Sequence, residues 1–292
     1  MKLAAAAAIL LVGCGAADEE PPREPAPLRV MTFNVLCSLC GSEEFDPWEE
    51  RLAYFGDIFA RHDPDLIGIQ ELTPLAGEVE QILEQAPGRA ALYFAPESGL
   101  PYPDATIVYR TERFEVLEHG EYWLSPTPDE PRSTGFADPQ LPRLLVWARL
   151  ADLENDGELY FASTHFDNNV PSQELSAPLV KERTLPYLDG PVVVVGDFNA
   201  KPPSPGYEIL MTEALHGFAF VDTFDRAAEP GIVSNQEPVP SYDTGARIDH
   251  VLLAGTAAEW TVEAWAADLT VYGPSERYPS DHFPIAVKLA TK

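Results

Sequence analysis

Several short polar motifs follow apolar, strand-like runs in this chain, and their side chains are of types that handle phosphate esters. The motifs contain the following amide, carboxylate and imidazole side chains: Asn34, Glu71, His165, Asp197, Asn199, Asp249, Asp281 and His282. Such groups at strand ends reduce stability unless they converge on a ligand. Hydrolysis of a phosphate ester needs a charged clamp on the phosphoryl oxygens, an activated water and a proton for the leaving oxygen. The series therefore predicts a metal-assisted phosphate-ester hydrolase.

The acidic motifs each suit part of that chemistry. Glu71 follows the apolar run Leu66–Ile69, where a carboxylate is a suitable ligand for magnesium; taken alone it is also typical of a solvated turn. Asp197 and Asn199 flank Phe198 directly after four valines. Strand alternation predicts that both polar side chains lie on one face, where they could orient a water and hold a phosphate oxygen. The alternative for this motif is an Asx turn that ends the strand.

Two imidazoles also stand at strand boundaries. Asp249 precedes one apolar run and His282 precedes another. An aspartate hydrogen-bonded to one imidazole nitrogen would fix the tautomer of His282, leaving the other nitrogen to face phosphate or water. His165 is the second imidazole. His250 points away from Asp249 on alternation, and its role stays open. The other histidines are interpreted as structural or solvated: His62, His119 and His216.

The elements that must position these groups are mostly short strands. Apolar runs and alternation predict strands over 28–36, 65–70, 105–109, 114–123, 144–151, 158–164, 192–195, 247–253, 260–265 and 284–289. Helices are predicted over 46–62, 75–86, 172–188 and 204–214, the first with Asp46 as its N-cap and Pro47 at N1. Because strict βαβ repetition is missing, the pattern favours two packed sheets flanked by helices.

The bulk composition narrows the class of partner. The chain has 292 residues and 45% hydrophobic content, which suffices for a sizeable α/β core. Its 47 acidic and 19 basic residues give a formal net charge of -28. Such a chain repels polyanions at long range, so nucleic acid is disfavoured as a partner. We expect a monomer.

The first residues predict export. Lys2 and the apolar run 3–13 form a signal peptide, and Leu11-Val12-Gly13-Cys14 resembles a bacterial lipobox in which Cys14 is lipidated. The alternative is an ordinary secretory peptide with an incidental cysteine. Residues 14–27 are predicted to be an acidic, proline-rich tether. We expect a protein anchored by lipid to the cell envelope, and Gly15 after the cysteine favours the outer membrane.

Cys37 and Cys40 remain as a Cys-x-x-Cys pair. In an exported protein this spacing favours a local disulfide near the site. The competing interpretations of this pair are a redox motif and half of a zinc site. A zinc site would need two further ligands, and the sequence holds no second cysteine pair.

The motifs Thr32-Phe33-Asn34, Ile69-Gln70-Glu71, Ser163-Thr164-His165, Gly196-Asp197-Phe198-Asn199 and Ser280-Asp281-His282 resemble those of the endonuclease/exonuclease/phosphatase superfamily, over a domain spanning 28–292. That superfamily includes DNase I-like nucleases, inositol-polyphosphate phosphatases and bacterial sphingomyelinases. The resemblance implies an α/β fold, a four-layer α/β/β/α sandwich of two mixed sheets with the site at one edge.

The same resemblance implies a role for each motif residue. Asn34 and Glu71 match metal-site residues, and Asp281 completes the metal shell. Asp197 matches the residue that activates the nucleophile or protonates the leaving group. Asn199 and His165 match phosphate contacts, Asp249 and His282 match an Asp–His pair, and Arg110 is similar to a position near the phosphate. Either Asp197 or the Asp249–His282 pair handles the protons.

The expected activity is a Mg²⁺- or Mn²⁺-dependent phosphoesterase, with a phosphodiester as the favoured substrate. One alternative is an endonuclease, although the basic loops that grip DNA are not evident. Another is a lipid phosphoesterase of the sphingomyelinase or phosphoinositide kind. A catalytically silent binding protein on the same fold is the alternative from a different class, and the presence of every matched motif residue argues against it.

Overall fold

The computed structural model describes residues 25–74, 77–136 and 141–291. The predicted signal peptide over 1–13, the lipidation site at Cys14 and most of the tether 14–27 lie outside these residues. Within the described ranges, every helix is too short or too polar to cross a bilayer.

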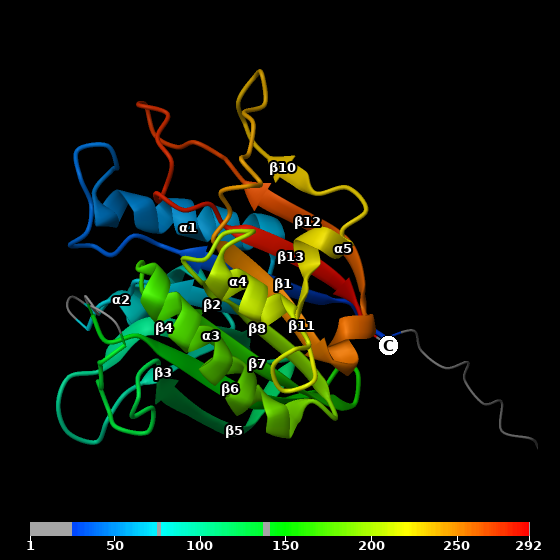
Figure 1. The fold of residues 1–292 in the computed structure, drawn as a ribbon. Coiled ribbons are helices and arrows are strands. Elements are labelled where there is room, and N and C mark those ends of the chain that lie inside the picture. The colour runs from blue at the N-terminus through cyan, green and yellow to red at the C-terminus, as the bar shows by residue number, and fades with distance from the viewer. Residues whose placement is uncertain (1–24, 75–76, 137–140, 292) are drawn as a thin grey trace, which may run out of the picture.

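Two sheets pack face to face at the centre of the domain (Figure 1). Among the described residues, the first sheet has the order β10 (Gly231–Val233), β12 (Thr261–Asp268), β13 (Ile285–Ala290), β1 (Leu28–Asn34), β2 (Leu66–Gln70), β4 (Tyr102–Arg110) and β3 (Arg89–Phe94). The second has the order β5 (Phe114–Trp123), β6 (Leu144–Asp152), β7 (Gly157–His165), β8 (Pro191–Asp197), β11 (Asp249–Gly255) and β9 (Val221–Asp222). Both sheets are mixed, because β1 and β2 are parallel and so are β7 and β8.

Helices cover the outer face of each sheet. On the first sheet, α1 (Trp48–His62) and α2 (Glu78–Gln85) pack against Phe33 and Ile69. On the second, α3 (Val170–Thr184), the 3-10 turn η1 (Leu185–Tyr187) and α4 (Pro205–Met211) cover Val192 and Val194. The short α5 (Thr223–Arg226) and η2 (Thr256–Glu259) complete the described helices. This arrangement is the four-layer α/β/β/α sandwich that sequence analysis predicted.

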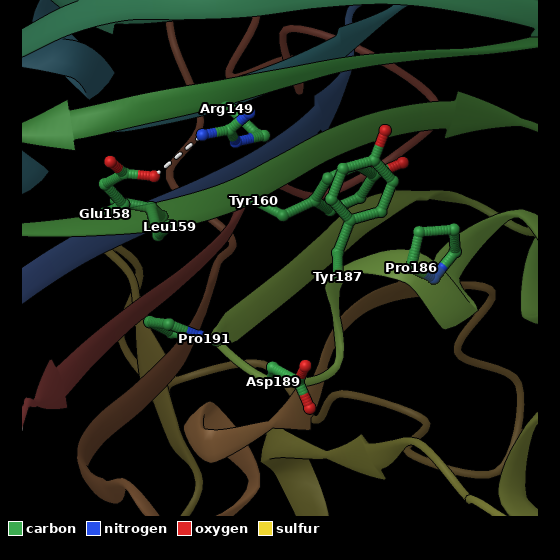
Figure 2. Close-up of a pocket in the computed structure, with 9 residues that line it drawn as sticks. Arg149, Glu158, Leu159, Tyr160, Pro186, Tyr187, Asp189 and Pro191 are labelled. Atoms are coloured by element: carbon green, nitrogen blue, oxygen red, sulfur yellow. Dashed lines mark hydrogen bonds and ion pairs between the residues drawn. The ribbon is translucent and has the colours of Figure 1, made fainter.

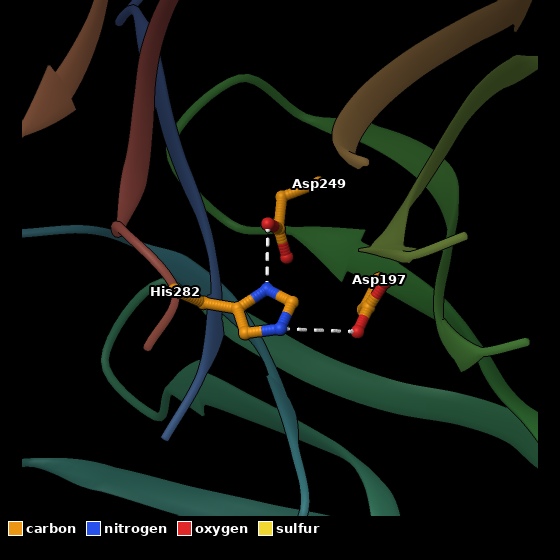
Figure 3. A group of neighbouring side chains, drawn as sticks. All are labelled: Asp197, Asp249 and His282. Atoms are coloured by element: carbon orange, nitrogen blue, oxygen red, sulfur yellow. Dashed lines mark hydrogen bonds and ion pairs between the residues drawn. The ribbon is translucent and has the colours of Figure 1, made fainter. Parts of the chain in front are cut away.

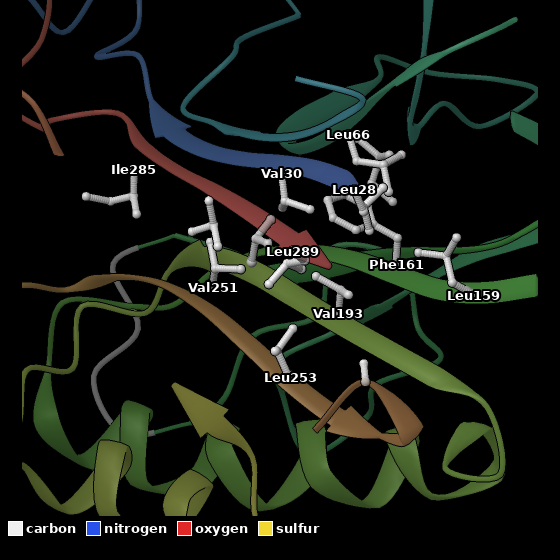
Figure 4. Close-up of a cluster of buried hydrophobic side chains, with 14 of the residues drawn as sticks. Leu28, Val30, Leu66, Leu159, Phe161, Val193, Val251, Leu253, Ile285 and Leu289 are labelled. Atoms are coloured by element: carbon white, nitrogen blue, oxygen red, sulfur yellow. The ribbon is translucent and has the colours of Figure 1, made fainter. Parts of the chain in front are cut away.

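The main core lies between the two sheets (Figure 4). The valine run of β8 shows how alternation divides a strand between two layers. Val193 and Val195 enter the core between the sheets, whereas Val192 and Val194 face α3. All four are fully buried, as expected of a strand covered on both faces.

Some local predictions were wrong. Asp46 does not cap α1: the N-cap residue is Pro47, without a side-chain hydrogen bond, and Asp46 accepts instead from the Tyr54 hydroxyl at 3.0 Å. Strand β3 was missed because it is a half-buried edge strand with little alternation. The strand predicted over 114–123 matches β5. The proline-disturbed helix predicted over 172–188 is α3 followed by η1.

Candidate active site

The polar motifs meet at one edge of the sandwich. Asn34 ends β1 and Glu71 follows β2, which runs parallel to it. In the second sheet, His165 is the register partner of Asp197, and Asp249 at the start of antiparallel β11 is paired with Asp197 as well. The C-terminal ends of the parallel strands therefore lie at one edge of the sandwich. The N-terminal end of the antiparallel strand lies at the same edge.

Close approach of the two sheets joins the two halves of the site. A β-carbon at Gly68 would lie 2.3 Å from the Val195 side chain, so glycine is required where β2 crosses β8. The Asn34 amide nitrogen then reaches across the sheets to Asp197 Oδ2 at 3.1 Å, and it also donates to Glu71 Oε1 at 2.9 Å. Asn34 therefore bonds a carboxylate in each half of the site.

Asp197 lies at the centre of the cluster. Its side chain is 1% exposed, and its Oδ2 lies 3.4 Å from His165 Nε2 and 3.7 Å from His282 Nε2. Figure 3 shows His282 between Asp197 and Asp249. Two imidazoles and an amide thus converge on one carboxylate oxygen.

The hydrogen bond expected between Asp249 and His282 is present. His282 Nδ1 lies 2.8 Å from Asp249 Oδ2, which leaves Nε2 facing Asp197 (Figure 3). Burial lowers the pKa of His282, but the Asp249 carboxylate outweighs that effect and raises the pKa to about 10. Asp197 and Asp281 act in the same direction. The imidazole is therefore held in its protonated form at neutral pH.

His165 has its own carboxylate partner, Asp104, which sequence analysis missed. His165 Nδ1 lies 3.0 Å from Asp104 Oδ1, and Arg143 binds the other Asp104 oxygen at 3.1 Å. Burial works to raise the pKa of Asp104, but His165 and Arg143 outweigh it and hold the pKa below its ordinary value. Both missed residues stand at the beginning of antiparallel strands. Each precedes an apolar run directly, and that position is the sequence signal that could have identified them.

Asn199 departs from the predicted alternation. Strand β8 ends at Asp197, and Asn199 has a left-handed backbone with φ of 49°, so strand geometry does not extend to it. Its backbone N–H donates to Asp197 Oδ1 at 2.8 Å, and its amide nitrogen donates to the Phe166 carbonyl at 3.0 Å. Asn199 thus orients Asp197, as an Asx turn does. Its contact with phosphate stays a prediction.

The oxygen-rich side of the site fits a hard divalent cation. Glu71 has a left-handed backbone with φ of 70°, and its Oε2 accepts from the Cys37 N–H at 3.4 Å. The Ser280 hydroxyl donates to the Asn34 carbonyl at 2.7 Å and lies 3.3 Å from Asp281 Oδ1. Carboxylate and amide oxygens of this kind are the ligands that Mg²⁺ and Mn²⁺ prefer.

A second set of donor atoms lies close together, but it could hold a cation only with His282 neutral, because a protonated imidazole has no lone pair to donate. One ligand atom from each of Asp197, Asp249 and His282 lies within 4.8 Å of the others. Asp249 Oδ1 is buried and accepts no hydrogen bond from the described residues. The two donor sets share one site, because Asn34 bonds both Glu71 and Asp197.

Arg51 of α1 lies behind these groups, with its side chain fully buried. Its guanidinium donates to the backbone carbonyls of Val35, Leu36, Cys37, Asp46 and Pro279. Burial lowers the pKa of Arg51, and Asp281, Glu78 and Glu71 oppose that effect. Arg51 is thus a buried cation that makes no direct ion pair with a described carboxylate and lies in the field of the acidic site.

Cys37 and Cys40 form the favoured disulfide, with Cα atoms 5.0 Å apart, in the loop that follows Asn34. The prediction for Arg110 was wrong. Its Nε binds Asp65 at 3.0 Å, at the edge of the sandwich opposite to the site. The reason is that β4 runs antiparallel to β2, so the end of β4 lies beside the beginning of β2.

The open question of His250 has a structural answer. Its Nδ1 lies 2.9 Å from Asp222 Oδ2, and its Nε2 lies 3.1 Å from the Ala200 carbonyl. Both ring nitrogens are therefore occupied inside the protein, and the side chain is buried. His250 supports the strand that carries Asp249 and does not face the site.

A separate cavity of about 180 Å³ lies at the other end of β7 and β8 (Figure 2). Tyr160 and Tyr187 stack there with centroids 4.3 Å apart, and Arg149 is paired with Glu158 at 3.0 Å. None of the motif residues lines it. The chemistry is therefore confined to the opposite edge.

The chain is similar in sequence to proteins of a known family. Residues 31–282 match the family described as Endonuclease/Exonuclease/phosphatase family. Protein angel of Drosophila melanogaster is 25% identical over 274 residues, which cover 81% of this chain and 73% of that protein.

Solved structures show the same fold. An endonuclease/exonuclease/phosphatase family protein from Bacteroides thetaiotaomicron has a TM-score of 0.77 and 25% identity, covering 92% of this chain and all of the other. A mannosyl-6-phosphatase from the same organism has a TM-score of 0.75 and 25% identity, covering 90% of this chain and all of the other. The human Nocturnin catalytic domain has a TM-score of 0.67 and 20% identity, covering 92% of this chain and 94% of the other, and shows the fold alone.

Proposed function

The chain belongs to the endonuclease/exonuclease/phosphatase family, and from this premise we propose that it is a divalent-metal-dependent phosphoesterase that cleaves a phosphodiester by attack of water. The observation that carries the proposal is the convergence on Asp197. His165, His282 and Asn34 all approach Asp197 Oδ2, and Glu71 accepts a hydrogen bond from the same Asn34 amide. Asp281 is next to His282 in the chain and raises the pKa of its imidazole. This combination provides proton transfer and charge neutralisation within one small site.

Each group has a proposed task. Asn34, Glu71 and Asp281 would hold the cation, and a bound Mg²⁺ or Mn²⁺ supplies positive charge against the phosphoryl oxygens. Asp197 is oriented by Asn34 and by the Asn199 N–H, so its carboxylate can accept a proton from the attacking water.

The two histidines have complementary tasks. Protonated His282, aligned by Asp249, gives its Nε2 proton to the leaving oxygen as the P–O bond breaks, which balances the proton that Asp197 takes from water. His165 donates from Nε2 to a non-bridging oxygen of the phosphoryl group; in its neutral form this requires Nδ1 to accept, as it can from Arg143 Nη1 at 2.7 Å. Donors placed in advance where negative charge develops are an effective way to stabilise a transition state.

Charge supports a small phosphate ester over nucleic acid. The formal net charge of -28 disfavours approach of a polyanion. The mannosyl-6-phosphatase, which matches at 25% identity, also supports a small substrate. An endonuclease remains the second candidate, since the chemistry of the site would serve it equally.

We also propose that the enzyme is exported and acts as a monomer. Export would proceed through the signal peptide 1–13, and lipid on Cys14 would anchor the domain to the envelope by the acidic tether 14–27. Labelling with a radioactive fatty acid, compared between wild type and Cys14→Ser, tests the anchor.

Turnover of two chromogenic esters tests the activity. Bis-p-nitrophenyl phosphate and p-nitrophenyl phosphate are offered with Mg²⁺, with Mn²⁺ and with EDTA. We expect metal-dependent cleavage of the diester, lost with EDTA. His282→Ala should lower kcat by about 10²- to 10⁴-fold, the range for loss of a positioned proton donor.

His119→Ala is the matched control, because His119 is exposed on edge strand β5. It should leave turnover unchanged. Equal activity of the His282 variant and the control would refute the role of His282. Full activity in EDTA would refute the metal dependence.

A further inference from the structure

We propose that a cavity beside the catalytic centre is the subsite for the group esterified to the phosphate, and that this group is a single uncharged ring with an apolar face. The inference rests on the proposed function and specifies its substrate class. The cavity has a volume of about 250 Å³. Its apolar walls are Leu72, Pro74, Tyr102, Leu141 and the Cys37–Cys40 disulfide.

The cavity is continuous with the reacting groups. Glu71 and His165 line it and belong to the catalytic cluster as well. A phosphate held between these two residues would therefore place its ester group directly at the cavity. The position follows from shared walls and needs no movement of the chain.

The walls are held in place before any ligand arrives. The fully buried Glu78 carboxylate accepts from the Ser38 hydroxyl in the disulfide loop and from the Thr73 N–H at 2.7 Å in the facing loop. The Tyr102 hydroxyl donates to the Pro142 carbonyl at 2.8 Å, and Arg132 lies 5.0 Å from its ring centroid. A preformed pocket of this kind reduces the entropic cost of binding.

The residues that line the cavity favour an uncharged group, although Arg132, which forms no ion pair with a described carboxylate, lies against the Tyr102 ring. Arg143 is the only arginine or lysine among the described lining residues, and it is already paired with Asp104 at 3.1 Å. A second phosphate on the substrate would therefore find no unpaired cation among these residues, whereas an uncharged ring loses nothing by entering.

The size of the cavity and the chemistry of its walls limit the kind of group that it can accept. Pockets for drug-sized ligands span about 300 to 1,000 Å³, so this cavity suits one ring and excludes a polymer segment. Apolar walls pack against the flat face of a ring, while Asp104 and Arg143 offer hydrogen-bond partners at one end. A pyranose and an aryl ring share this chemistry.

Substrate comparison separates these sources. Glucose 6-phosphate and benzyl phosphate are compared with ringless glycerol 3-phosphate, each as the monoester or methyl diester that the wild-type protein hydrolyses. All three are esters of primary alcohols, so leaving-group reactivity does not favour the ring esters. At least one ring ester should exceed the ringless ester in kcat/KM by about tenfold or more, as expected of a pocket that discriminates apolar groups. The preferred ring identifies the source.

Leu141→Trp tests the location, since Leu141 is 53% exposed at the rim and a larger side chain would fill the cavity without entering the core. The variant should lose the ring preference by about tenfold and keep turnover of the ringless ester. Leu153→Trp is the matched control, because Leu153 is 57% exposed on the hairpin at the opposite edge.

The outcomes separate the subsite from the activity. An unchanged ring preference in Leu141→Trp overturns the subsite, and so does a preference for glucose 1,6-bisphosphate over glucose 6-phosphate. If the wild type hydrolyses no ester, the proposed function fails instead. The subsite is then tested by calorimetry, which compares the binding affinities of glucose 6-phosphate and glycerol 3-phosphate. Equal affinities overturn the subsite. A preference for glucose 6-phosphate that Leu141→Trp leaves intact overturns it as well.

Discussion

Arg51 donates a hydrogen bond from Nη1 to the backbone carbonyl of Pro279, 3.0 Å away and 228 residues further along the chain. The same nitrogen also donates to the Val35 carbonyl at 2.6 Å. One buried guanidinium therefore ties the loop after Asn34 to the loop that precedes Asp281. These two loops carry ligands expected to share one cation, so Arg51 sets the distance between them.

Loss of this connection should weaken metal binding more than substrate binding. We expect Arg51→Met to lower the free energy of unfolding by about 3 kcal/mol, because it leaves buried carbonyls without donors. It should also raise the Mg²⁺ concentration for half-maximal activity by about tenfold, since a shift of about 1.4 kcal/mol in metal binding corresponds to that factor. Urea unfolding and metal titration measure the two effects.

Arg149→Met is the control for Arg51, because Arg149 forms only exposed ion pairs with Glu118 and Glu158. Such exposed pairs contribute little to stability, because water and salt screen them. A normal metal requirement in Arg51→Met, with substrate KM raised instead, would contradict the positioning role.

Metal binding should stabilise the fold measurably. A ligand that binds only the folded state at 100 times its dissociation constant adds about 2.7 kcal/mol of stability. We expect saturating Mg²⁺ to raise the melting temperature of the wild type, and Glu71→Gln to abolish that increase by removing a charged ligand. Glu229→Gln, at an exposed loop position, should keep the increase. Equal increases in both variants would rule out Glu71 as a ligand.

Acid should destabilise the protein partly through Asp268. This carboxylate is buried between Arg61 and His62; burial opposes ionisation, but His62 and the other partners outweigh it and lower the pKa to about 2. Because the pKa is depressed on folding, the stabilisation is present above pH 3.8 and is lost as the pH falls toward 2. The shift corresponds to about 2 kcal/mol.

Asp268→Asn isolates this effect. The difference in unfolding free energy between wild type and variant should be about 2 kcal/mol larger at pH 5 than at pH 2, because protonated Asp268 resembles the amide. Chemical denaturation at the two pH values measures it. A difference that stays constant with pH would show that charge on Asp268 contributes nothing.

Gly196 should tolerate no side chain. Its φ is 155°, and a β-carbon would lie 2.1 Å from the Thr164 carbonyl oxygen on the neighbouring strand. We expect Gly196→Ala to destabilise the protein by about 3 kcal/mol, because backbone atoms of β7 and β8 must move apart. Gly41→Ala, where a β-carbon meets nothing within 4 Å, should change stability by less than about 0.5 kcal/mol. Thermal unfolding compares them, and similar melting temperatures would contradict the clash.

Prediction from sequence succeeded where a signal is local. The four valines of β8 predict a strand covered on both faces, and the strand predicted over 114–123 is present with the same ends. Asp249 and His282 were recognised as a pair from their motifs, and they are hydrogen-bonded at 2.8 Å. Each of these conclusions depends on residue type, alternation or a motif within a few positions.

Two failures at the site share a physical cause, which is strand direction. Arg110 and Asp104 stand at opposite ends of β4, and sequence analysis selected Arg110 because it follows an apolar run. Since β4 is antiparallel to β2, the beginning of β4 lies at the site, so Asp104 meets His165 while Arg110 meets Asp65. Strand polarity depends on pairing between distant segments, which short motifs do not encode.

The sequence by itself therefore determined most of the polar groups that we propose do chemistry, the layer architecture and the excess of negative charge, because side-chain type and local periodicity are properties of the chain. Tertiary structure alone decided which groups meet. Asn34 and Asp197 are 163 positions apart in the chain, and their side chains come within 3.1 Å only when the two sheets stack. Arg51 reaches Pro279 only when the loops at the edge of the sheets are brought together. Contacts of this kind form through burial of the core between the sheets, a property of the whole fold.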